Sequence, residues 1–180
     1  MMKKLILPIL ITAVATLSFG FTASQTTVTH SAITFAIKNL GINTGGTIGG
    51  LIANVKLDPA NLASSTIEAS VDVNTINTDN TLRDDHLKTD EFFDAAHYPK
   101  ITLKSVSLKH KSGNNYSGKF NLTIKNKTKL IDVPFTCTDK GNAIVFSGSF
   151  KLNRLDFGVG ESSFTLSDEV TVTVNAEMGK

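Results

Sequence analysis

The chain has 180 residues, 41% of them hydrophobic, and its 18 basic residues exceed its 16 acidic residues by two. This length is sufficient for one domain with its own core, and a single cysteine excludes an internal disulfide. Both excess charges, Lys3 and Lys4, belong to the amino-terminal segment, so the remainder is balanced at 16 basic (18 − 2) and 16 acidic residues. Such a balance argues against a nucleic acid or an anionic membrane surface as a partner.

Residues 1–23 have the three-part layout of a secretory signal peptide. Lys3 and Lys4 form a positive start, an apolar run follows, and small residues including Ala23 end the segment. The alternative, a membrane anchor, is disfavoured because the apolar run is short for a span and is interrupted by proline and hydroxyl residues. The sequence therefore predicts cleavage near Ala23 and a periplasmic or secreted protein with a single domain over residues 24–180.

Alternating hydrophobic and polar residues predict an all-β fold in the remainder of the chain. The expected strands are residues 31–38, 46–57, 66–74, 100–111, 116–125, 130–139, 143–153 and 169–178. Turn-forming residues at 113–115, 126–127 and 140–142 indicate tight connections, which favour antiparallel neighbours in chain order. We therefore predict an eight-stranded antiparallel up-and-down β-barrel. Cys137 shares the parity of the hydrophobic residues on its strand, so we interpret it as a small core residue.

Two glycine pairs, Gly45–Gly46 and Gly49–Gly50, lie at the start of and within the second predicted strand. A glycine inside a strand marks a bend or a close approach of another group. A bent sheet of about eight strands can close, and a barrel of that size has either a filled interior or room for one small ligand. The sequence leaves both alternatives open. If the interior is hollow, we expect Gly50 to face it.

Phenylalanine is the main aromatic residue, since the chain has eleven Phe, two Tyr and no Trp. A cavity lined by such side chains is apolar and poor in hydrogen-bonding groups, which suits a long hydrocarbon chain. The residues that we expect to line a tunnel are Phe35, Ile37, Gly50, Phe92, Phe93, Phe120, Phe150 and Phe157. The alternative for the phenylalanines in the connections is that they plug the end of the barrel.

Residues 81–97 interrupt the strand pattern with charged residues and two adjacent phenylalanines. Asn80 or Thr81 can cap a short helix there. A charged insert between strands is a typical place for a functional site, and an enzyme that uses Asp84 and His86 is one alternative function. These two residues are two positions apart and do not share a helix face, and the sequence has no metal-ligand spacing. We therefore expect no metal and no cofactor other than a bound lipid.

The chain has only two arginines, Arg83 and Arg154, among its 18 basic residues. A planar cation with several donors suits recognition of a polar or phosphorylated head group, so we expect both arginines, with Asp84 and His86, at the barrel mouth. The alternative is an internal salt bridge that fastens the insert to the barrel. It would join Arg83 to Asp156, or Arg154 to an acidic residue of the insert.

Seven short motifs follow one another in a recognisable order. They are residues 31–41 (SAITFAIKNLG), 83–87 (RDDHL), 92–94 (FFD), 98–99 (YP), 101–105 (ITLKS), 122–124 (LTI) and 153–160 (NRLDFGVG). In this order they resemble the YceI-like family of periplasmic, polyisoprenoid-binding proteins, over essentially all of residues 24–180. Two positions depart from the family pattern: residues 125–127 (KNK) replace the glycine usual after LTI, and Leu103 stands where Phe is common.

The resemblance implies a lipocalin-like barrel with helical segments near residues 81–97 and a tunnel for isoprenoid or fatty-chain lipids. We therefore predict non-catalytic binding of an isoprenoid or other long-chain amphiphilic lipid, for storage, transport or sensing in the cell envelope. The alternatives are the enzyme described above and a solid-core barrel that serves as a stress-related interaction module. A homodimer formed through an exposed strand face is left open.

Overall fold

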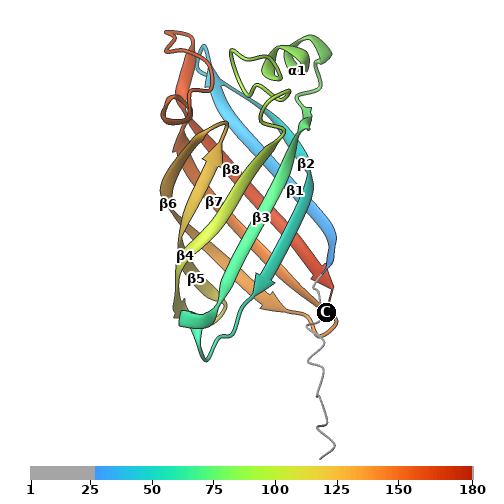
Figure 1. The fold of residues 1–180 in the computed structure, drawn as a ribbon, viewed down its shortest axis with the longest axis vertical. Coiled ribbons are helices and arrows are strands. Elements are labelled where there is room, and N and C mark those ends of the chain that lie inside the picture. The colour runs from blue at the N-terminus through green and yellow to red at the C-terminus, as the bar shows by residue number, and fades with distance from the viewer. Residues whose placement is uncertain (1–26, 180) are drawn as a thin grey trace, which may run out of the picture.

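In the computed structural model, which describes residues 27–179, the chain forms a closed barrel of eight antiparallel strands (Figure 1). The strands are β1 (Thr27–Asn39), β2 (Ile42–Lys56), β3 (Thr66–Asn77), β4 (Lys100–Ser112), β5 (Asn115–Ile124), β6 (Lys127–Asp139), β7 (Ala143–Asn153) and β8 (Leu166–Gly179). Each strand pairs with its neighbours in the sequence, and β8 pairs with β1. The predicted all-β class and up-and-down topology are confirmed, whereas the predicted signal peptide lies outside the described residues.

A two-residue alternation gives the strands their inward and outward faces. In β5, Tyr116, Phe120, Leu122 and Ile124 are buried, and the residues between them are exposed or partly buried, except for Gly118, which follows the buried parity. Successive side chains of a strand point to opposite faces of the sheet. One face therefore points into the barrel, and the other carries the polar residues.

The β1–β2 connection differs from the prediction, because β2 begins at Ile42 instead of residue 46. Leu40 and Gly41 form a two-residue connection in which both residues have positive φ, 50° and 77°. Asn and Gly usually occupy such a turn. A leucine in the first position hides the turn from any prediction based on turn-forming residues.

The connections divide between the two ends of the barrel (Figure 1). We call one end the α1 end, because it carries the helix α1 (Thr81–Leu87). Its connections are residues 40–41, 78–99, 125–126 and 154–165, the last of which includes the 3-10 helix η2 (Arg154–Phe157). The opposite end carries residues 57–65, with the 3-10 helix η1 (Leu62–Ser64), and the hairpins at 113–114 and 140–142. No helix among residues 27–179 is long and apolar enough to cross a bilayer.

The half of the barrel nearest the opposite end is filled with side chains. Its central cluster consists of Leu108, Tyr116, Phe120, Val133 and Phe135. The rings of Tyr116 and Phe135 stack with centroids 5.6 Å apart, and Phe120 meets Phe135 edge-on at 6.4 Å. Cys137 packs against this cluster, in agreement with its interpretation as a small core residue. We call this group the aromatic cluster.

A seam between β6 and β7 explains the position of η2. The two strands pair only from Phe135 with Gly148 to Asp139 with Ile144, near the opposite end. Towards the α1 end the pairing stops, and η2 packs there against β6. Phe157 of η2 is almost completely buried and belongs to a cluster with residues of β5. Phe157 therefore fills the seam.

Candidate functional site

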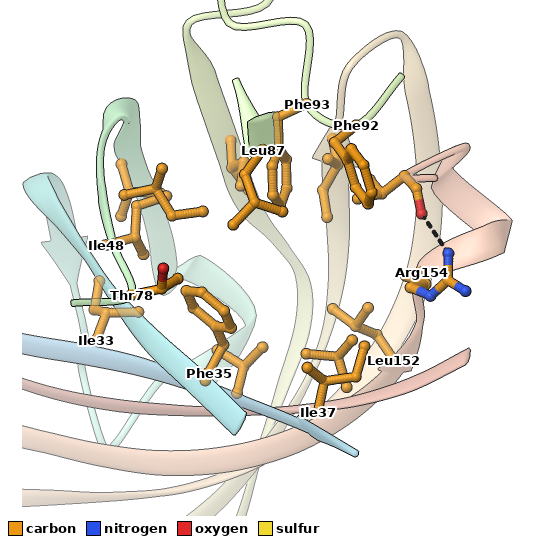
Figure 2. Close-up of a pocket in the computed structure, with 18 of the residues that line it drawn as sticks. Ile33, Phe35, Ile37, Ile48, Thr78, Leu87, Phe92, Phe93, Leu152 and Arg154 are labelled. Atoms are coloured by element: carbon orange, nitrogen blue, oxygen red, sulfur yellow. Dashed lines mark hydrogen bonds between the residues drawn. The ribbon is translucent and has the colours of Figure 1, made fainter. Parts of the chain in front are cut away.

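A cavity of about 390 Å³ lies inside the barrel at the α1 end (Figure 2). Its wall consists mainly of inward-facing aliphatic and phenylalanine side chains. On the strands these include Ile33, Phe35 and Ile37 (β1), Ile48 and Leu51 (β2), Val71 (β3), Ile101 and Leu103 (β4), Leu122 and Ile124 (β5), Phe150 and Leu152 (β7), and Val170, Val172 and Val174 (β8). The volume falls in the range of about 300–1,000 Å³ that is typical of small-molecule sites.

The floor of the cavity is its boundary with the filled half. Leu103 and Phe150 line the cavity and also pack against the aromatic cluster. Phe120, within that cluster, is almost completely buried. The aromatic cluster therefore closes the cavity on the side of Leu103 and Phe150, and the cavity is a blind pocket that opens at the α1 end.

The insert between β3 and β4 forms the roof of the cavity. The side chain of Asn80 caps α1 by accepting a hydrogen bond from the backbone N–H of Arg83 at 3.0 Å, which confirms the predicted short helix and one of its two predicted caps. After α1 the chain turns back, and the N–H of Phe93 donates to the carbonyl of Leu87 at 3.1 Å. Leu87, Phe92 and Phe93 consequently project into the cavity from above (Figure 2).

Hydrogen bonds fix the insert to the neighbouring connections. The N–H of Gly160 donates to the carbonyl of Glu91 at 2.9 Å, and Lys125 Nζ donates to the carbonyl of Asp90 at 2.9 Å. Phe92 and Phe93 also pack against the buried cluster around Phe157. The roof is thus held by the 154–165 and 125–126 connections as well as by its own strands.

The mouth of the cavity combines exposed polar residues. Asn39, Arg83 and His86 line the cavity and are exposed to solvent. The Nε and Nη2 atoms of Arg83 donate to the side-chain hydroxyl and the carbonyl of Thr78. These bonds orient the guanidinium and use only two of its three nitrogens, so Nη1 retains donors that can face a ligand.

Asp84 and His86 face different partners. Asp84 does not line the cavity; its Oδ1 accepts hydrogen bonds from the N–H of Thr78 at 2.8 Å and from the Thr78 hydroxyl, which joins α1 to the end of β3. His86 Nε2 lies 3.0 Å from Glu91 Oε2, and its ring meets that of Phe92 edge-on at 4.9 Å. This geometry does not assemble Asp84 and His86 into a general acid–base pair. Within residues 27–179, no group of three or more His, Cys, Asp or Glu side chains is placed to hold a metal ion.

Arg154 lies at the edge of the cavity and organises the 154–165 connection. Its side chain is only 4% exposed. Nη1 donates to the carbonyl of Val159 at 2.9 Å (Figure 2), Nη2 to the carbonyl of Glu161 at 2.7 Å, and Nε to the carbonyl of Ser167 at 2.9 Å. Asp168 supplies the carboxylate, 3.2 Å from Nη2. The guanidinium therefore acts mainly as a fastener of this connection.

The alternative in which an arginine salt bridge joins the insert to the barrel is wrong in its partners. Arg83 is bonded to Thr78 instead of Asp156, and Arg154 pairs with Asp168 instead of an acidic residue of the insert. The physical reason is that η2 turns Arg154 under its own connection, where backbone carbonyls surround the guanidinium. The insert is fastened instead by the bonds from Gly160 and Lys125 described above.

The structure places the expected tunnel residues in two groups. Five line the cavity: Phe35, Ile37, Phe92, Phe93 and Phe150. The other three lie elsewhere: Phe120 in the aromatic cluster, Phe157 in the seam, and Gly50 at an exposed irregularity of the β2–β3 pairing. Gly50 has a φ of +67°, and a Cβ there would lie 2.8 Å from Cβ of Asp72. Gly50 is therefore required for the backbone conformation of β2 at this irregularity, and not for the cavity wall.

The sequence interpretation did not single out the wall contributed by β2, β3 and β8. Ile48, Val71, Val170, Val172 and Val174 all line the cavity. Strand parity could have identified the β3 and β8 residues as inward-facing, because they occupy the hydrophobic positions of the alternation. It could not have identified Ile48, because the β2–β3 pairing shifts register between Thr47 and Ile52. Parity alone does not distinguish the hollow end of a barrel strand from the filled end.

Comparisons with known proteins agree on one family. The family model of the YceI-like domain matches residues 25–178. A UPF0312 protein of Vibrio cholerae is 28% identical over 177 residues, which cover 91% of this chain and 94% of the relative. A UPF0312 protein of Yersinia pestis is 28% identical over 157 residues, covering 82% of this chain and 80% of the relative.

Solved structures have the same fold. BcnA of Burkholderia cenocepacia superposes with a TM-score of 0.77 at 28% identity, over 82% of this chain and 95% of that chain. The YCEI protein of Campylobacter jejuni superposes with a TM-score of 0.70 at 26% identity, over 77% and 86% of the two chains. A domain from Saccharophagus degradans, described as a polyisoprenoid binding domain, shares the fold with a TM-score of 0.70 at 14% identity, over 86% and 97%.

Proposed function

Because this chain belongs to the YceI-like family, we propose that it binds an isoprenoid or another long-chain amphiphilic lipid without catalysing a reaction. The observation that carries the proposal is the blind apolar cavity of about 390 Å³, lined by aliphatic and phenylalanine side chains from most of the strands. The description of the structurally similar Saccharophagus degradans domain as polyisoprenoid binding supports the choice of ligand class.

The energetics of such a site favour a hydrocarbon chain. Each CH₂ group removed from water contributes about 0.8 kcal/mol. A tail of about ten carbons would thus supply about 8 kcal/mol before the costs of association are subtracted. Because hydrogen-bonding groups are scarce on the wall, the cavity selects for apolar character and length instead of a particular functional group.

We assign the polar end of the ligand to the mouth. Arg83 is held by Thr78 with Nη1 available, and His86 and Asn39 line the same opening. A head group with carboxylate or phosphate oxygens would accept charge-assisted hydrogen bonds from the guanidinium. Arg154 has its donors committed to carbonyls and to Asp168, so we give it no direct part in head-group binding.

We further propose that the protein acts in the periplasm or outside the cell, in storage, transport or sensing of the lipid. The signal-peptide layout of residues 1–23 supports this location. A lipid that must cross an aqueous compartment requires a shielded apolar site, which the cavity provides.

Native mass spectrometry of gently purified protein tests the proposal. We expect a co-purified lipid mass, or uptake of an added prenyl or fatty-chain amphiphile by protein that was delipidated beforehand. Protein that is uniformly free of ligand and takes up neither kind of amphiphile would overturn it. Turnover of a lipid substrate that disappears in both Asp84→Asn and His86→Gln variants would instead favour the enzyme alternative.

A further inference from the structure

Exposed hydrophobic side chains gather around the mouth of the cavity. Leu40, Ile42 and Leu82 are 74%, 72% and 84% exposed, and Phe164 is fully exposed. All four lie at the α1 end: two at the β1–β2 hairpin, one on the first turn of α1 and one in the 154–165 connection (Figure 1). Transfer of such side chains out of water is favourable, so the exposure of four of them at one place requires an explanation.

The remainder of the described surface provides a contrast. The other large exposed hydrophobic residues of the described chain are Ile52, Val106 and Leu130, which stand singly on three different strands. The connections of the opposite end contain none of the large exposed hydrophobic residues found among residues 27–179. The concentration is therefore specific to the end at which the cavity opens.

Each of the four residues lies within two positions of a residue of the cavity wall. Leu40 follows the cavity-lining Asn39, Ile42 precedes Thr44 by two positions, Leu82 precedes Arg83, and Phe164 precedes Leu166 by two positions. The exposed hydrophobic side chains thus lie in or next to three different connections that each contribute to, or adjoin, the cavity wall. We call Leu40, Ile42, Leu82 and Phe164 the hydrophobic rim.

Leu40 occupies a backbone conformation that leucine disfavours. Its φ of 50° lies in the left-handed region, at the turn position where Asn, Asp or Gly is usual. A non-glycine residue in that region generally carries an energetic cost, and the Leu40 side chain is too exposed to recover it by packing within the fold. The backbone hydrogen bond from the Leu40 N–H to the carbonyl of Thr165 holds this conformation, and a contact of the side chain outside the molecule would add to it.

Hydrogen bonds hold Leu40 and Phe164 in one unit. The N–H of Leu40 donates to the carbonyl of Thr165 at 2.7 Å. Ser163 Oγ accepts from the N–H of Thr165 at 3.2 Å and lies 3.0 Å from the Thr165 hydroxyl, so the backbone around Phe164 is ordered. The two apolar tips are therefore presented together instead of on independent loops.

We propose that the hydrophobic rim docks the protein on a lipid bilayer, so that the cavity mouth faces the membrane and a lipid passes between them without crossing water. Apolar side chains at several loop ends suit a fluid hydrocarbon surface, which adapts to their spacing. This inference rests on the proposed function, because the ligand of the cavity is itself a component of bilayers.

Charge at this end limits the kind of bilayer surface that fits. The four connections of the α1 end carry eight acidic residues (Asp79, Asp84, Asp85, Asp90, Glu91, Asp94, Asp156 and Glu161) and four basic residues (Arg83, Lys88, Lys125 and Arg154). Attraction to anionic lipids therefore does not drive docking. Zwitterionic lipid should suffice, and addition of anionic lipid should not strengthen binding.

Flotation with phosphatidylcholine vesicles tests the docking. We expect wild-type protein to float with the vesicles and the double variant Leu40→Asn, Phe164→Ser to bind about a hundredfold more weakly, at about tenfold for each side chain removed from the bilayer. Leu40→Asn suits the turn, so folding is preserved. The matched control is Ile52→Thr, Leu130→Thr, which removes two exposed hydrophobic side chains from the barrel wall and should leave binding unchanged.

A second measurement separates this inference from the proposed function. Uptake of a dansyl-labelled fatty acid delivered from cyclodextrin requires the cavity but no bilayer, and the rim variant should retain it. Wild-type protein that takes up this probe but does not float with vesicles would overturn docking while leaving lipid binding intact. Protein that takes up the probe neither from cyclodextrin nor from vesicles would overturn the proposed function. A wild-type dimer that Leu40→Asn converts to a monomer would assign the rim to a second copy of the chain, and would also overturn docking.

Discussion

The two halves of this barrel share one strand alternation and differ in the side chains placed on it. Near the opposite end, rings of β5 and β6 meet within the interior, with Phe120 and Phe135 centroids 6.4 Å apart. Near the α1 end, inward positions are held largely by Val and Ile, as in Val170, Val172 and Val174 of β8, and a space of about 390 Å³ remains. Closure of the sheet thus produces an interior, and side-chain volume decides whether that interior is core or site.

The difference assigns different tasks to similar residues. A phenylalanine in the filled half contributes to stability through close packing, whereas one in the hollow half borders the cavity and mainly shapes the site. Leu103 and Phe150 are the boundary, because they contact both regions. Substitutions in matched pairs, one in each half, can therefore separate stability from ligand binding.

The largest expected effect is that of Phe120→Ala compared with Phe35→Ala. Phe120 is nearly fully buried in the aromatic cluster, so its truncation should lower the free energy of unfolding by about 3–5 kcal/mol. Phe35 is partly buried on the cavity wall and should cost about 1–2 kcal/mol, because its surroundings are not close-packed. Denaturant unfolding measures both, and equal losses would contradict the division into halves.

Arg154→Met tests the connection over the hollow half. The substitution leaves three carbonyl acceptors, of Val159, Glu161 and Ser167, without their donor, and we expect a loss of about 3 kcal/mol. The control is Arg83→Met at the exposed mouth, which should cost about 1 kcal/mol. If thermal or denaturant unfolding showed a larger loss of stability for Arg83→Met than for Arg154→Met, Arg154 would not be the residue that holds the 154–165 connection.

Val172→Phe should fill the hollow half. Val172 lies between Phe35 of β1 and Phe150 of β7 in the pairing register, so a third ring would block the cavity. We expect lipid affinity to fall about tenfold or more, which corresponds to about 1.4 kcal/mol, with little change in stability. The matched control, Val133→Phe in the aromatic cluster, should overpack and cost about 1–3 kcal/mol of stability with smaller effects on uptake. Titration with a fluorescent fatty acid and a denaturant curve on each variant distinguish the two.

Gly50→Ala should affect stability alone. The positive φ and the short approach to Asp72 predict a loss of about 1–2 kcal/mol. Lipid uptake should remain at the wild-type level, because Gly50 lies away from the cavity wall. A loss of lipid uptake in a folded variant of unchanged stability would show that Gly50 belongs to the ligand site.

Cys137 reports on the filled half without a mutation. Burial against the aromatic cluster, and secondarily the charge of Asp139, raise the pKa of its thiol, so less thiolate is present at a given pH than for a free cysteine. Native protein at pH 8 should therefore react with iodoacetamide more slowly than denaturant-unfolded protein. Equal rates would show that this half opens readily.

The roof and the mouth illustrate how far prediction from the sequence extends. The sequence alone predicted the insert at 81–97, its Asn80 cap and the cavity-facing Phe92 and Phe93. These features could be predicted because local capping chemistry and a break in alternation are encoded within a few residues. The partners of Arg154 could not be predicted, because they depend on how η2 folds beneath its own connection. The turn at Leu40 was also hidden, since its residue type disagrees with its conformation.

By itself, the sequence determined the eight strands, their antiparallel order and the apolar character of the interior. Those properties follow from the period of two and from short connections, which act between neighbours in the chain. Only the tertiary structure decided where the interior is empty, that Phe120 and Phe157 lie outside the cavity wall, and that the exposed hydrophobic residues meet at its mouth. Those outcomes depend on side-chain volumes contributed by strands far apart in the chain, which meet only when the sheet closes.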